Sequence, residues 1–210
     1  MKKVYIITAL LICANFIYAQ DDDYEYSNQD EFKTIFGGKE LGGYGGIGLG
    51  YSQIDDRHAI TIDARGGVLL GHWLMFGIGG AGFINQYEYN QALNMDASLV
   101  GGYGGFVVEA IVLPKSGVHL SFPILAGVGG VAYTTWMKDN ENYEQDNEVN
   151  ESSVFLVVEP GAEIEFNFTR FFRMAAFISY RYTSDIDLTY ASHRSLINYS
   201  TGVRVKFGKF

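Results

Sequence analysis

Cysteine is almost absent from this 210-residue chain and proline is scarce, with one and three residues respectively. The single cysteine, Cys13, lies in an amino-terminal stretch that has the layout of a secretion signal. The mature chain would therefore hold no thiol and no disulfide, although it is exported to an oxidising place. Its stability must come from packing and from backbone hydrogen bonds. Because Cys13 follows the bulky Ile12, where a lipoprotein signal carries a small residue, we do not expect a lipid anchor.

The apolar run near the amino terminus, Val4–Ile12, is too short for a helix that crosses a membrane. Lys2 and Lys3 precede this run, and a small-residue cleavage site ends at Ala19. A charged start, a short apolar run and a small residue are typical of a signal peptide. The sequence therefore predicts a signal peptide over residues 1–19.

Basic residues are also few, 15 against 24 acidic ones, and the formal net charge is -9. It falls to -11 when the two charges of Lys2 and Lys3 leave with the signal. We do not expect a chain of this charge to bind duplex nucleic acid. Residues 20–36 are acidic and show no apolar period, so we predict a flexible periplasmic leader there. A solvated tail is favoured over a cation site in this leader.

Glycine (26 residues), tyrosine (15) and phenylalanine (15) are plentiful, a composition typical of β-rich proteins. In eight stretches apolar and polar residues alternate with a period of two, which is the pattern of strands. The last stretch shows it best, because Val203, Val205 and Phe207 alternate with Arg204 and Lys206. We predict strands over residues 41–54, 59–70, 74–87, 97–113, 118–135, 154–168, 172–183 and 195–210.

The connections after the second, fourth and sixth predicted strands are short. Those after the third, fifth and seventh, the last being Asp185–Arg194, are longer and polar, and only the short loop after the first strand breaks this alternation. Short turns at one end and longer loops at the other are typical of outer-membrane barrels, whose strands need about 9–11 residues to cross the bilayer. The predicted fold is all-β, an eight-stranded antiparallel up-and-down transmembrane β-barrel over residues 37–210.

Alternation alone does not say which face of each strand points inward, since a soluble lipocalin-like barrel places its apolar face inside. Here the polar face is rich in glycine, which suits the crowded interior of a narrow barrel. Aromatic residues lie near the strand ends on the apolar face, as at a membrane interface. We therefore predict an apolar exterior and an interior ion network of five acids and five bases: Asp63, Arg65, Glu109, Glu159, Glu163, Glu165, Arg173, Arg181, Arg204 and Lys206.

One pair in this network can be predicted from the turn at residues 169–171. A three-residue turn there sets Asn167 opposite Arg173 and, further along both strands, Glu159 opposite Arg181. We therefore expect an ion pair between Glu159 and Arg181 inside the barrel.

The final strand, which ends in Val-Lys-Phe-Gly-Lys-Phe at Phe210, resembles those of the small eight-stranded outer-membrane barrels. The chain is similar to the transmembrane domain of outer membrane protein A and to outer membrane protein X. Its glycine-rich strands and this ending look like those of barrels from Bacteroidetes-type bacteria. The resemblance implies a monomer in the cell outer membrane, in contact with its lipid. It also implies that Phe210 is the signal for the barrel-assembly machinery. Phe207 lies on the apolar face and Phe210 has the opposite parity, so a bulge or a frayed end is expected.

Two groups of residues have the residue types of catalytic sites. Glu109, His119 and Ser121 share the polar face and have the residue types of an acyl-transfer triad, but a buried polar network is favoured and no G-x-S-x-G elbow accompanies them. His193 and Ser195 faintly resemble the His-x-Ser of outer-membrane lipid A deacylases, but the residue after the serine is not the expected asparagine. We predict that neither group is catalytic.

The loop over residues 138–153 is a third candidate site, because hard cations prefer carboxylate oxygens. It lacks the spacing of a calcium-binding loop, so a solvated loop is favoured. The acids of this loop are Asp139, Glu141, Glu144, Asp146, Glu148 and Glu151.

The predicted role is an outer-membrane barrel that anchors and displays surface loops without catalysis. We expect no cofactor and no metal. We also expect no pore, because eight strands leave room only for side chains. The alternatives are a barrel enzyme acting on outer-membrane lipid and a soluble secreted lipocalin-like binder.

Overall fold

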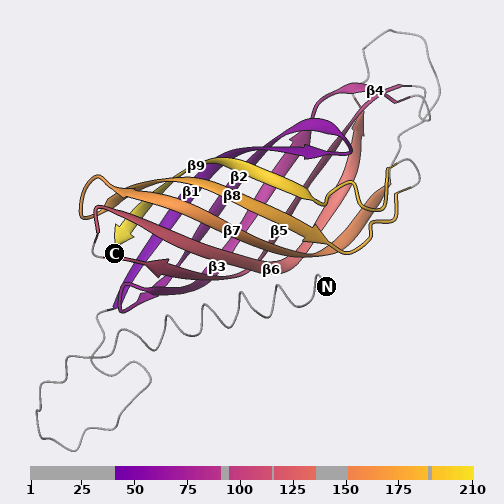
Figure 1. Ribbon diagram of the computed structural model, residues 1–210. Helices are drawn as coiled ribbons and strands as arrows, with labels where there is room; N and C mark the ends of the chain where they lie inside the picture. The colour runs from indigo at the N-terminus through magenta and orange to yellow at the C-terminus, as the bar shows by residue number, and fades with distance from the viewer. Residues whose placement is uncertain (1–40, 91–94, 115, 136–150, 189–190) are drawn as a thin grey trace, which may run out of the picture. The chain divides into compact units, whose positions relative to one another are not determined.

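The described part of the chain consists of β-strands joined by turns and loops (Figure 1). The structure, a computed structural model, describes residues 41–90, 95–114, 116–135, 151–188 and 191–210. The predicted signal peptide and acidic leader lie outside the described residues. The strands are β1 (Leu41–Ile54), β2 (Arg57–Leu70), β3 (Leu74–Asn85), β4 (Glu88–Asn90), β5 (Met95–Val112), β6 (Val118–Thr135), β7 (Ser152–Asn167), β8 (Phe172–Thr183) and β9 (Asn198–Lys209).

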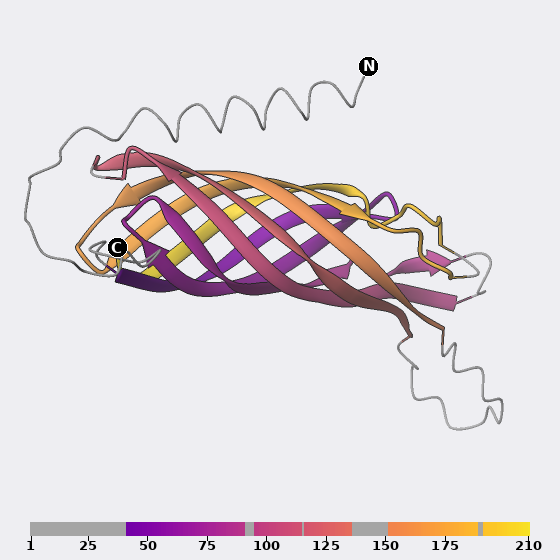
Figure 2. The ribbon, with the colours of Figure 1, turned by 90° about the horizontal axis from the view of Figure 1, so that it is seen from below.

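The strands close into a barrel of eight long strands, which Figures 1 and 2 show from two sides. Successive strands pair antiparallel, β1 pairs with β9, and β3 pairs with β5 to close the sheet. The predicted third strand is interrupted at Gln86 and Tyr87 and resumes as the short β4, which pairs with β5. The predicted fold, an all-β antiparallel barrel of eight strands, is confirmed.

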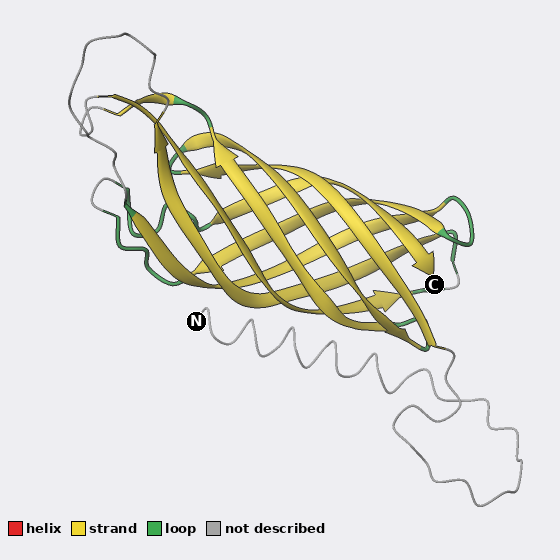
Figure 3. Ribbon diagram, turned by 180° about the vertical axis from the view of Figure 1, so that it is seen from behind, coloured by secondary structure: helices red, strands yellow, loops and turns green. Residues whose placement is uncertain are grey.

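Figure 3 shows strands and loops over the described ranges. Within these ranges, no helix has the length and apolar character needed to cross a membrane.

The two ends of the barrel differ in their connections. The short-turn end carries the turns between β2 and β3, β5 and β6, and β7 and β8, together with the C-terminus (Figure 1). The loop end carries β4 and the described part of the connection between β8 and β9. The one short connection at the loop end is the two-residue turn Asp55-Asp56, in which φ is 55° and 60°. Positive φ at both residues is what a type I′ hairpin turn requires, so this turn closes β1 and β2 without a loop.

The apolar face of each strand points outward and the charged face points into the lumen, as predicted. Ile78 is 67% exposed and Phe106 is 76% exposed, whereas Glu165 and Lys206 are 0% exposed. Large exposed apolar side chains occur on all eight long strands. Apolar surface left in water costs about 25 cal/mol per Å² relative to an apolar environment, so this exterior is suited to lipid.

Glycines on the lumen face make room for the large side chains that fill the barrel. A Cβ atom at Gly48 would clash with the carboxylate of Asp63. A Cβ atom at Gly129 would lie 2.5 Å from Cζ of Phe155 and 2.6 Å from Cβ of Tyr103. The glycine-rich polar face is therefore explained by crowding inside a narrow barrel.

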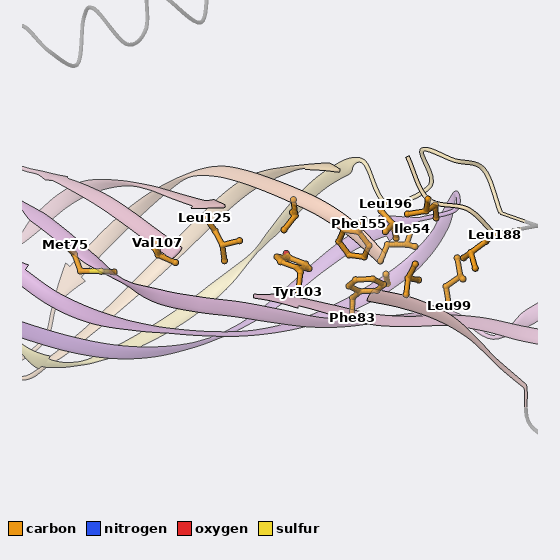
Figure 4. Close-up of a cluster of buried hydrophobic side chains, with 14 of the residues drawn as sticks. Ile54, Met75, Phe83, Leu99, Tyr103, Val107, Leu125, Phe155, Leu188 and Leu196 are labelled. Carbon is orange, nitrogen blue, oxygen red and sulfur yellow. The ribbon is translucent and has the colours of Figure 1, made fainter. Parts of the chain in front are cut away.

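The loop end of the lumen is filled by an apolar cluster, which the sequence pattern does not predict (Figure 4). The connection between β8 and β9, predicted as a polar loop, turns three side chains into this cluster, and each is at most 3% exposed. We call the part of the cluster at the loop end the apolar plug. Its members at this end include Ile54, Phe83, Leu99, Val131, Phe155 and Val157 from the strands and Ile186, Leu188 and Leu196 from the connection.

Backbone hydrogen bonds fix this connection over the barrel mouth. The amide of Asp55 donates to the carbonyl of Ser195 at 3.1 Å, and the amide of Ile186 donates to the carbonyl of His193 at 3.1 Å. The amide of Ser184 donates to the carbonyl of Leu156, in β7, at 3.0 Å. The connection therefore has a defined path that holds its apolar side chains against the strands.

The end of β9 differs from the sequence-based expectation. Pairing of β9 with β1 continues to Lys209 opposite Gly43 without a bulge. Phe210 follows directly and keeps its lumen parity, stacking on Tyr44 with ring centroids 5.4 Å apart. The guanidinium carbon of Arg173 lies 3.7 Å from the centroid of the Phe210 ring. No bulge is needed, because the inward parity of Phe210 is satisfied by packing inside the barrel mouth.

Candidate functional site

The charged side chains of the lumen converge on the ammonium group of Lys206, in β9. Its Nζ atom lies 2.7 Å from Oε1 of Glu109, 2.7 Å from Oε2 of Glu163 and 2.5 Å from Oε1 of Glu165. Glu109 is in β5 and the other two are in β7, so these contacts cross the lumen between strands that do not pair with β9. The four side chains are at most 1% exposed. One buried cation therefore links three strands through its three donors.

Two arginines extend this cluster toward β2. Arg204 places Nη2 2.7 Å from Oδ1 of Asp63 and also forms an ion pair with Glu163. Arg65 places Nη1 3.2 Å from Oε1 of Glu163 and 3.6 Å from Oε2 of Glu109. Each buried carboxylate thus contacts several donors, which is the condition under which buried charges are tolerated.

The cluster reaches the short-turn end through Glu165, whose Oε2 lies 2.6 Å from Nε2 of His119 and 3.4 Å from Nη1 of Arg173. Eight of the ten predicted interior charges thereby belong to one connected network. We call it the lumen network; it contains the acids Asp63, Glu109, Glu163 and Glu165 and the bases Arg65, Arg173, Arg204 and Lys206.

Glu159 and Arg181 remain outside the lumen network, and the ion pair predicted between them is wrong. The predicted register of the β7–β8 hairpin is confirmed, but Glu159 instead accepts hydrogen bonds from two hydroxyl groups. These come from Tyr103 and from Ser179, whose Oγ lies 2.5 Å from Oε1 of Glu159. The backbone register places the two residues opposite one another, but the side chains turn to different partners.

Arg181 is fully buried and its guanidinium contacts hydroxyl groups and aromatic rings. Nη2 donates to Oγ of Ser52 at 2.9 Å and to Oγ of Ser200 at 3.4 Å. The guanidinium carbon lies 5.2 Å from the ring centroid of Phe83 and 5.6 Å from that of Tyr103. Nε and Nη1 have no hydrogen-bond partner. Among the described residues, Arg181 therefore carries a buried charge without a carboxylate partner, next to Phe83 of the apolar plug.

Glu109, Glu163 and Glu165 are the set, among the described residues, with the geometry of a metal site. One oxygen from each lies within 4.8 Å of the others. The ammonium group of Lys206 already lies among these oxygens, at 2.5 to 2.7 Å. A metal ion at the same place would be repelled by this ammonium, so the carboxylates are matched to an internal cation.

The structure does not assemble the triad weighed from the sequence. His119 contacts Glu165, while Ser121 donates to Oε2 of Glu163 at 3.4 Å, and Glu109 contacts Lys206. The three candidate residues thus bond to other members of the lumen and not to one another, and all three are buried. A serine without a hydrogen bond to the histidine lacks the base that a nucleophile needs.

The remaining sequence motifs have structural partners or lie outside the described residues. Nδ1 of His193 lies 2.7 Å from the carbonyl oxygen of Ile186, so this histidine fastens the connection between β8 and β9. Ser195 bonds through its backbone, and its Oγ is buried without a partner. Of the acidic loop over residues 138–153, residues 138–150 lie outside the described residues.

The lumen is closed at two levels, by the lumen network and by the apolar plug. Between them lies a cavity of about 30 Å³, lined by residues that include Asp63, Tyr103, Glu159 and Ser179. A cavity of this volume holds about one or two water molecules. The arrangement fits a barrel whose lumen, within the described strands, is occupied by side chains of the lumen network and the apolar plug.

The comparison with solved structures finds the same fold in Neisserial surface protein A. The two share 11% sequence identity with a TM-score of 0.56, and the match covers 82% of this chain and 99% of the other. This chain shares its fold with Neisserial surface protein A. The outer membrane protein Ail of Yersinia pestis, its attachment invasion locus protein, matches with 13% identity and a TM-score of 0.46, over 80% of this chain and 99% of its own. No family model matches the chain, and no curated protein matches its sequence.

Proposed function

We propose that this protein is a closed β-barrel of the bacterial outer membrane that anchors and displays its loop end. The observation that carries the proposal is the inverted distribution of side chains. Charges such as Glu165 and Lys206 are fully buried, while residues such as Phe106 and Ile78 form an exposed apolar belt. In water this distribution would be unfavourable on both faces, whereas lipid stabilises the exterior and the network satisfies the interior.

The side chains that occupy the described lumen and the separate positions of the catalytic candidates both favour an anchoring role over transport or catalysis. The lumen network and the apolar plug fill the described lumen, so the part free to contact partners is the loop end. Lipid hydrolysis is not favoured, because Ser121 and His119 are buried and bond to glutamates and not to each other. In this proposal the barrel acts as a monomer whose exterior contacts outer-membrane lipid.

Membrane fractionation and gel mobility test the proposal together. We expect the protein to fractionate with outer membranes and to migrate differently with and without boiling, because a closed barrel resists detergent until it is heated. Recovery of a folded soluble monomer without detergent would favour the lipocalin-like alternative and would contradict the proposal. Lipid release by the purified barrel, abolished by the substitution Ser121→Ala, would instead favour the enzyme.

A further inference from the structure

A basic pocket lies at the short-turn end of the barrel, apart from the lumen network's centre. It has a volume of about 490 Å³, and among the described residues its lining contains three cations but no aspartate or glutamate side chain. Even with a main-chain carboxylate on Phe210 counted, its lining keeps a net positive charge. The lining residues are Asn167, Phe168, Thr169, Arg170, Phe171, Arg173, Lys209 and Phe210.

The pocket straddles the rim between the outside and the lumen. Lys209 has the same outward parity as Phe207 and is exposed, as is Arg170 in the β7–β8 turn. Arg173 belongs to the lumen face, is only 5% exposed, and presents an Nε atom without a hydrogen-bond partner. Its guanidinium lies against the ring of Phe210, which fixes its orientation. Two exposed cations and one nearly buried, partly unsatisfied cation therefore line the same pocket.

An aromatic patch on the outer face adjoins this pocket. The rings of Phe168 and Phe172 have centroids 5.8 Å apart, and those of Phe172 and Phe207 are 5.0 Å apart. These residues have outward parity, and Phe168 and Phe207 are more than half exposed. Aromatic residues at a strand end mark the level of lipid headgroups, where lysine side chains also extend toward water.

We propose that this pocket binds the anionic headgroup of a phospholipid in the leaflet at the short-turn end, an inference that rests on the proposed membrane insertion. The phosphate group contacts Arg170 and Lys209, and Arg173 supplies a further donor at the inner edge of the pocket. The acyl chains lie against the aromatic patch. Arginine and lysine together match the charge and the multiple acceptor oxygens of a phosphate. A free phosphate offers the same oxygens but would not use the patch, so we assign the site to a lipid.

The test is native mass spectrometry of the full barrel released from detergent micelles that contain phosphatidylglycerol or phosphatidylcholine of the same chain length. We expect wild-type protein to retain phosphatidylglycerol preferentially. The double variant Arg170→Gln/Lys209→Gln should retain it roughly 30-fold less, from the usual contribution of two basic residues near an anionic surface. Arg194→Gln, which removes an exposed cation at the loop end, should leave retention unchanged.

Separate measurements distinguish the possible failures. Gel mobility with and without boiling reports insertion for every variant, so loss of the barrel is distinguished from loss of the lipid. A barrel that inserts normally but retains both lipids equally would overturn this inference and leave the proposed function standing. Displacement of phosphatidylglycerol by an equal concentration of inorganic phosphate would overturn the assignment to a lipid. Single variants Arg170→Gln and Lys209→Gln, each with partial loss, would support it.

Discussion

At the scale of single residues, two of the buried cations in the lumen, Lys206 and Arg181, have opposite environments. Lys206 contacts three carboxylates, whereas Arg181 contacts hydroxyls and rings and has two nitrogens without partners. Removing one partner of a buried ion pair is costly because it leaves an uncompensated buried charge. Removing a buried charge that has no partner instead eliminates an uncompensated charge. The two residues should therefore respond differently to the same substitution.

The substitution Lys206→Met is expected to destabilise the barrel by about 3–5 kcal/mol, because three carboxylates lose their shared cation. Arg181→Met is its matched control and should change stability by at most about 1 kcal/mol, since the loss of hydrogen bonds to serine hydroxyls and of contacts with two aromatic rings is offset by removal of an unpaired buried charge. Urea unfolding in lipid or detergent, followed by tryptophan fluorescence, measures both. Equal losses for the two variants would show that Arg181 has an ionic partner after all.

The same residues show what could be read from the sequence. The turn at residues 169–171 fixed the hairpin register, including Asn167 opposite Arg173. Strand pairing says nothing about contacts that cross the lumen, and the lumen network consists largely of such contacts. Lys206 reaches β5 and β7, which are not neighbours of β9. Interior parity was therefore predictable from alternation, but the partner of each charge was not.

At the scale of elements, the connection between β8 and β9 behaves as part of the core. Ile186 and Leu188 alternate with acidic residues, a pattern that could have indicated an extended segment with one buried face. Its aspartates and serines gave it the composition of a solvated loop instead. A tertiary contact, the apolar plug, decides the structure of this connection, and local composition does not reveal it.

Leu196→Ala should destabilise the barrel by about 2–5 kcal/mol, because it leaves a cavity in a fully buried cluster. Leu156→Ala, on the outer face where Leu156 is 64% exposed, is the control and should cost less because detergent or lipid fills the gap. Unfolding of both variants under one condition gives the comparison. A smaller loss for Leu196→Ala than for Leu156→Ala would argue that the connection does not pack into the barrel.

Two aromatic residues at the end of the chain, Phe207 in β9 and Phe210 directly after it, have different surroundings. Phe210 packs on Tyr44 and Arg173 inside the mouth, whereas Phe207 is 58% exposed on the outer face. Deletion of Phe210 should impair assembly in cells, as the resemblance to outer-membrane barrels implies. Because Phe210 also packs on Tyr44 and Arg173, the purified deletion variant should also refold more slowly into detergent or be less stable once folded. Pulse-chase assembly and refolding measure the two effects, and refolding that stays normal would confine Phe210 to a signalling role.

At the scale of the whole molecule, closure of the sheet and filling of the lumen could both be inferred from glycine, parity and strand number. Eight strands leave a lumen that side chains fill. The structure adds that the filling is layered, with the lumen network toward the short-turn end and the apolar plug toward the loop end. Sequence alternation could not show this layering, because polar and apolar lumen residues occupy the same face of each strand.

Because the lumen network and the apolar plug form two separate layers in the lumen, we predict that the protein conducts no ions. Wild-type protein in a planar bilayer should show no discrete conductance steps, since an ion would have to cross both buried ion pairs and an apolar segment. Arg204→Ala/Lys206→Ala removes two cations of the lumen network but keeps the apolar plug, and Ile186→Ser/Leu196→Ser weakens the plug but keeps the network. Each variant, if gel mobility shows it folded, should remain closed, and only the combination of all four substitutions should conduct. Conductance steps from wild-type protein, or from either double variant, would contradict closure by two separate layers.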